Sequence, residues 1–111
     1  MVRATFLARA DGRLMGFRLK GHAMHGEFGS DIVCAAISAL CEGIANGLEK
    51  VVGLKLYERQ DDGLMEATVE PGQSEALIEK AQLLLSTLEL ALNDIKQQYP
   101  ECIRLDTKQW R

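Results

Sequence analysis

A histidine and a cysteine twelve residues apart are the best candidates for chemistry in this chain of 111 residues. His22 follows Gly21 in a glycine-rich stretch, and Cys34 follows Asp31 at the expected start of a helix. A thiol attacks only as its thiolate, which a free cysteine forms sparingly at neutral pH. The first turn of a helix and a neighbouring imidazolium both stabilise an anion. The pair therefore predicts Cys34 as a thiol nucleophile and His22 as its base.

The residues around this pair each allow two interpretations. Asp31 could orient His22, or it could only cap the helix. Ser38, one turn beyond Cys34, could hydrogen-bond near the site or bond back to its own helix. A cysteine on a small, apolar helix is more commonly a packed residue. Packing or simple solvation is the expectation for the other candidates, Cys41, Cys102 and His25.

A metal site is a competing interpretation of the same region. Its ligands would be His22, His25, Cys34 and Cys41, residue types that suit zinc. Their spacing does not resemble the usual zinc patterns, and Cys34 and Cys41 lie two helical turns apart. We therefore expect no metal and no cofactor.

Composition points to one soluble globular domain spanning residues 1–111. The chain is 47% hydrophobic and 26% charged, with a net charge of −3. Lys and Arg are scattered in ones and twos, which disfavours direct binding of nucleic acid. No continuous apolar run approaches the roughly 18–20 residues that cross a bilayer, and the first ten residues do not resemble a signal peptide. We expect a cytoplasmic protein, without a membrane partner, whose three cysteines stay reduced.

Hydrophobic periodicity predicts an α+β fold in the order strand-strand-helix-strand-strand-helix. Alternation predicts two hairpins with turns at Asp11-Gly12 and Asp61-Asp62-Gly63. The predicted strands are 2–9, 14–20, 54–59 and 64–69, the predicted helices are 31–51 and, after a cap at Ser74, 75–97, and 103–105 could add a short last strand. The helices should pack on a mainly antiparallel sheet, and residues 21–30 should form an exposed loop.

These residues also resemble a known family, the ribosomal-processing cysteine proteases called Prp. The resemblance covers nearly the whole chain, and it rests on one run: Gly21-His22-Ala23, Gly29, Asp31-Ile32-Val33-Cys34-Ala35-Ala36 and Ser38. It implies a cysteine protease with a His22/Cys34 dyad, with Gly21, Gly29, Asp31 and Ser38 at the family's other motif positions. The implied substrate is the precursor of large-subunit ribosomal protein L-27, which loses a short N-terminal extension, and the implied assembly is a homodimer.

The expected mechanism is ordinary thiol acyl transfer. His22 takes the thiol proton, Cys34 attacks the scissile carbonyl, and backbone N–H groups between residues 29 and 34 hold the oxyanion. The alternative is a non-catalytic assembly factor that only binds its ribosomal protein, since a net negative charge suits either role. We further expect loop 21–30 to close over the peptide.

Overall fold

The structure is a computed structural model that describes residues 1–22 and 31–110. Its elements follow the predicted order, including the last strand at the C-terminus. They are β1 Val2–Ala8, β2 Leu14–Lys20, α1 Ile32–Asn46, the π-helical η1 Gly47–Val52, β3 Leu56–Asp61, β4 Leu64–Val69, α2 Glu75–Gln98 and β5 Ile103–Gln109. The predicted α+β class is confirmed.

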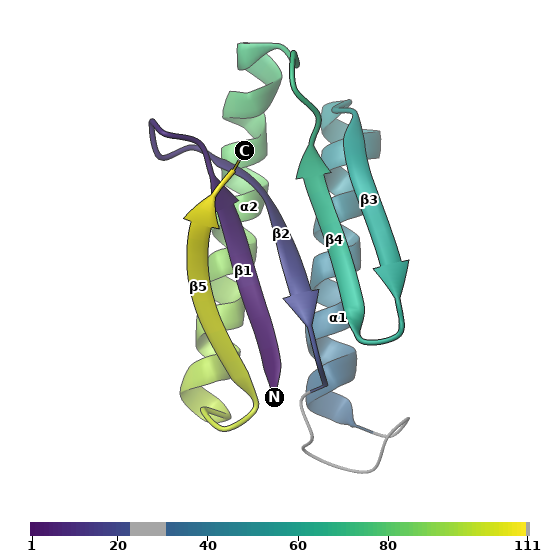
Figure 1. The fold of residues 1–111 in the computed structure, drawn as a ribbon, viewed down its shortest axis with the longest axis vertical. Coiled ribbons are helices and arrows are strands. Elements are labelled where there is room, and N and C mark those ends of the chain that lie inside the picture. The colour runs from purple at the N-terminus through teal and green to yellow at the C-terminus, as the bar shows by residue number, and fades with distance from the viewer. Residues whose placement is uncertain (23–30, 111) are drawn as a thin grey trace.

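The five strands form one sheet in the order β3-β4-β2-β1-β5. All neighbours are antiparallel except β1 and β5, which run parallel. The last strand extends well beyond the short segment expected from the sequence, because it pairs with the whole of β1. Both helices lie behind the sheet in Figure 1, and the near face of the sheet is left uncovered.

Alternation along the strands puts the core between the sheet and the helices. Phe6 on β1 pairs with Phe17 on β2, and both are almost fully buried. Each large buried side chain contributes about 1.5–3 kcal/mol by leaving water. The paired phenylalanines therefore place the core on the helix side of β1 and β2.

Helix α1 buries Val33, Ile37, Cys41 and Ala45 along one side. Leu40 on α1 and Val51 on η1 are apolar as well, but they are 37% and 84% exposed. The helix becomes π-helical at Gly47. The wider π turn changes the angular step per residue, so Val51 no longer follows the α-helical phase.

The segment Ile32–Val52 meets the length and hydropathy expected of a membrane-spanning helix, contrary to the sequence expectation. In this fold it is a core helix, since Val33, Ile37 and Leu48 are buried. Its hydropathy is high because much of its exposed side is apolar as well.

Candidate active site

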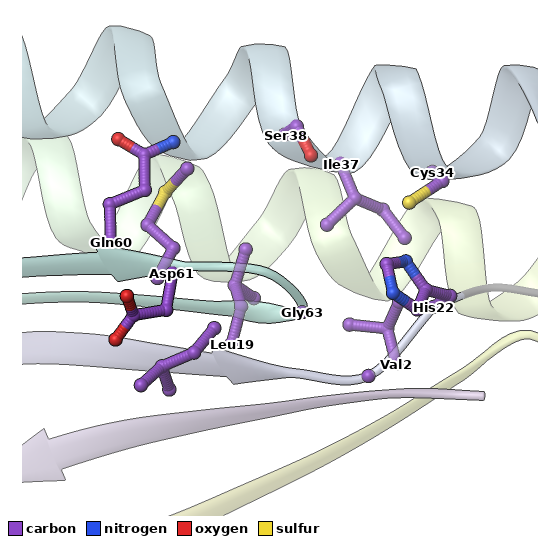
Figure 2. Close-up of a pocket in the computed structure, with 12 residues that line it drawn as sticks. Val2, Leu19, His22, Cys34, Ile37, Ser38, Gln60, Asp61 and Gly63 are labelled. Carbon is purple, nitrogen blue, oxygen red and sulfur yellow. The ribbon is translucent and has the colours of Figure 1, made fainter. Parts of the chain in front are cut away.

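A cleft of about 120 Å³ lies where α1 begins and β2 ends. Cys34 and His22, the two residues predicted to react, both line it. Its other lining residues come from β1, β2, α1 and the β3–β4 hairpin: Val2, Leu19, Gly21, Ile37, Ser38, Gln60, Asp61, Gly63, Leu64 and Met65. Figure 2 shows the Cys34 sulfur pointing from α1 toward the His22 ring.

The position of Cys34 follows from the start of α1. Asp31 is the N-cap, and its carboxylate Oδ1 accepts hydrogen bonds from the N–H groups of Val33 and Cys34, each at 3.0 Å. This capping fixes the first turn, typically by about 1 kcal/mol. Cys34 therefore sits in the first turn with its side chain half-buried at the cleft. Of the two roles considered for Asp31, capping is the one that these bonds show.

The same cap changes the expected oxyanion site. We expected backbone N–H groups up to Cys34 to be available to a substrate oxygen. Two of them, on Val33 and Cys34, already donate to the Asp31 carboxylate. An oxyanion could use them only by displacing that carboxylate, so an oxyanion site at other N–H groups between residues 29 and 34 stays a prediction.

His22 is held by the end of β2 and by the distant β3–β4 turn. Gly21 has a φ of +89°, and a Cβ there would lie 2.5 Å from the carbonyl oxygen of Met1. Only glycine fits such a position without moving the backbone. The N–H of Gly21 donates to the carbonyl oxygen of Gly63 at 2.9 Å. This hydrogen bond joins the segment that carries His22 to the β3–β4 turn.

The β3–β4 turn supplies two neighbours of His22 that sequence reasoning did not assign to the site. Asp62 Oδ1 lies 3.8 Å from His22 Nε2, and the Asp62 side chain is 88% exposed. A Cβ on Gly63 would lie 3.3 Å from the same nitrogen. The Asp61-Asp62-Gly63 motif was recognised as a turn, but nothing local in it shows which residue the turn contacts. The long-range pairing of β2 with β4 brings them together.

The remaining predicted residues fall in different places. Ser38 lines the cleft on the same side of α1 as Cys34, as Figure 2 shows. Gly29 and His25, with the rest of 23–30, lie outside the described residues. Cys41 and Cys102 are buried in the core. Burial raises the pKa of the Cys41 thiol to about 12, and it also raises the pKa of the Cys102 thiol. Of the proposed zinc ligands that the structure describes, only His22 and Cys34 therefore line the cleft.

Comparison with known proteins gives a consistent family. Residues 1–104 match the family model for cysteine protease Prp. The Staphylococcus aureus ribosomal processing cysteine protease Prp is 31% identical over 108 residues, which cover 97% of this chain and 100% of that protein. The Bacillus subtilis protein of the same name is 28% identical over 109 residues, covering 96% of this chain and 97% of that protein.

The likeness extends to three dimensions. The crystal structure of S. aureus Prp in complex with a covalently linked product peptide superposes with a TM-score of 0.84 at 31% identity, covering 97% of this chain and all of that one. The sequence, the length and the fold thus agree with one family. The chain belongs to the Prp family of cysteine proteases.

Proposed function

We propose that this protease removes the N-terminal extension of ribosomal protein L-27 in the cytoplasm, with Cys34 as nucleophile and His22 as general base. The observation that carries the proposal is the cleft that both side chains line, with the Cys34 sulfur facing the imidazole (Figure 2). The choice of substrate rests on the family resemblance and on relatives named as ribosomal processing proteases.

The chemistry follows from these positions. His22 takes the proton of the Cys34 thiol, and the thiolate attacks the scissile carbonyl carbon to form a C–S bond. The tetrahedral intermediate collapses as the C–N bond breaks, and His22 gives its proton to the leaving amine. Water, deprotonated by His22, then hydrolyses the thioester and frees Cys34. Asp62 Oδ1, at 3.8 Å from His22 Nε2, lies on the side of the ring that faces the β3–β4 turn.

The cleft suits an apolar side chain of the substrate. Part of the cleft lining is apolar, and Val2, Leu19 and Ile37 contribute to it. At about 120 Å³ it accommodates one side chain rather than a folded segment. A substrate with an apolar residue next to the scissile bond therefore fits best.

We also propose a homodimer formed through the outer face of α1. This face is exposed although it is apolar, and its residues are Ile32, Ala36, Ala39, Leu40 and Gly43. Small residues let two helices approach closely, and a two-fold axis would pair the face with its own copy. In light scattering, Ala36→Glu with Ala39→Glu should give monomers, whereas Ser86→Glu with Asn93→Glu on α2 should not. Monomeric wild-type protein at micromolar concentration would contradict the dimer.

The function is tested with the L-27 precursor itself. Wild-type enzyme should release the N-terminal extension at a single bond, identified by mass spectrometry of both products. Cys34→Ser should bind the precursor and leave it whole. If the wild type binds the precursor but does not cut it, the non-catalytic assembly factor becomes the better account. If it cuts a control ribosomal protein equally well, the assigned substrate is wrong.

A further inference from the structure

The face of the sheet that the helices leave uncovered, the open face, is cationic in a chain of net charge −3 (Figure 1). The strand registers place six of the 13 Lys and Arg residues on it, but only three of the 16 Asp and Glu residues. The cations are Arg3, Arg18, Lys20, Arg59, Arg104 and Lys108, and the anions are Asp61, Glu66 and Asp106. Six against three gives a net side-chain charge of +3, which leaves −6 for the rest of the chain.

Three of these cations form a row across adjacent strands. Arg3 on β1 is paired directly with Lys20 on β2 and with Arg104 on β5. All three side chains are exposed, and within residues 1–22 and 31–110 none of them forms an ion pair. Like charges directly opposite one another on neighbouring strands, about 5 Å apart, are destabilising. An anion bound along the row would remove that repulsion.

The open face also offers aromatic surface. A hollow at the other end of the strands is lined by Tyr57, Trp110 and Arg18, together with the carboxylate residues Glu66 and Glu70. Tyr57 is half-exposed there. Cations that follow a phosphate backbone, combined with aromatic rings on which bases stack, are the features that bind single-stranded nucleic acid. An acidic protein is a poorer fit as partner, because it would contact the cations but have no use for the aromatic rings. A second copy of this chain would be repelled, because its own open face is also cationic.

We propose that the open face of the sheet binds single-stranded RNA. Phosphates lie on the row of Arg3, Lys20 and Arg104, and a base stacks on Tyr57. This reverses the sequence expectation of no nucleic-acid contact, because residues far apart in the chain become neighbours only in the folded sheet. The cleft opens on the helix side of the same sheet, where Leu19 and Met65 point. RNA and a peptide substrate can therefore be bound at the same time.

Fluorescence anisotropy with a short labelled RNA of mixed sequence tests the proposal on the full-length protein. The row variant carries Arg3→Gln, Lys20→Gln and Arg104→Gln. A matched control variant removes the same charge from the helices, with Lys50→Gln, Lys80→Gln and Lys96→Gln, all exposed positions. Circular dichroism and thermal melting establish that both variants fold.

Wild-type protein should bind the RNA at low salt. The row variant lacks three cations, each of which would contact one phosphate. The slope of its log affinity against log salt concentration should therefore be smaller in magnitude by about 2 than that of the wild type. The slope of the control variant should hardly change. Tyr57→Ala should weaken binding about fivefold or more without changing the slope.

Three outcomes would overturn the proposal. One is no binding by the wild type at low salt, and another is an equal loss of affinity in the row and control variants. The third is stronger competition by poly-glutamate than by unlabelled RNA, which would assign the face to an acidic protein.

Discussion

The substitution Gly63→Ala tests whether the β3–β4 turn positions His22. Gly63 has a φ of +68°, and an added Cβ would lie 3.3 Å from His22 Nε2. That separation is tighter than ordinary contact, so the imidazole must move by a few tenths of an ångström. A displacement of 1 Å can cost about a hundredfold in rate, so a shift of roughly half that size should cost about tenfold.

Backbone strain must be separated from this effect. An alanine in the left-handed region costs about 1–2 kcal/mol of stability wherever it occurs. Gly12, in the β1–β2 turn, has a φ of +92° and no atom within 4 Å of an added Cβ. Gly12→Ala is therefore the matched control: it should lose the same stability in urea unfolding and keep full activity.

The assay follows cleavage of a peptide that spans the L-27 precursor site, together with the rate at which iodoacetamide alkylates Cys34. Both rates should fall in Gly63→Ala, because a displaced His22 no longer accepts the thiol proton. Iodoacetamide is small enough to reach Cys34 in a narrowed cleft. If the added methyl group only narrowed the cleft, peptide cleavage would slow but alkylation of Cys34 by iodoacetamide would not. Equal activity in Gly63→Ala and Gly12→Ala would refute the positioning role.

Three further predictions concern the thiols, the sheet and one ion-pair cluster. Brief alkylation of the native enzyme at mildly alkaline pH should modify Cys34 and spare Cys41, because burial raises the pKa of Cys41 to about 12; equal labelling in peptide maps would contradict this. Gly16→Ala should lower the free energy of unfolding in urea by about 2–4 kcal/mol, since its Cβ would lie 2.3 Å from the Ala67 carbonyl oxygen; wild-type stability would show that β2 and β4 approach less closely. The Arg9 guanidinium holds the pKa of Asp11 well below its usual range, so this pair stabilises the fold above about pH 4 and stops doing so as the pH falls further. Arg9→Gln should therefore lower the Tm slightly at neutral pH and not at the acid end, and a difference in Tm that is independent of pH would contradict this.

The sequence predicts the parts of the site that local chemistry determines. Asp31 followed by an apolar run predicts a capped helix start, and Cys34 falls in its first turn as expected. The Asp61-Asp62-Gly63 turn was also predicted, because a tight turn has its own residue preferences. The contact of that turn with His22 was not, since it depends on which strands pair, and period-two patterning does not identify a strand's neighbours.

The same limit explains the other differences. Ile32 and Leu40 are apolar although they face outward, so hydrophobicity alone does not show which side of α1 is buried. The length of β5 depends on its parallel pairing with β1, which the sequence of β5 alone does not encode. The cationic row likewise exists only once β2, β1 and β5 are side by side.

A double-mutant cycle on Cys34 and His22 tests directly whether the two residues act as one catalytic unit. Cleavage of the L-27 precursor is followed for the wild type, Cys34→Ala, His22→Ala and the double variant, with precursor binding measured alongside. Residues that act as one catalytic unit lose the same activity singly or together. All three variants should have the same residual rate, on the order of 10⁴-fold or more below the wild type, with precursor binding intact. Losses that add, or a His22→Ala enzyme that still cuts readily, would contradict it.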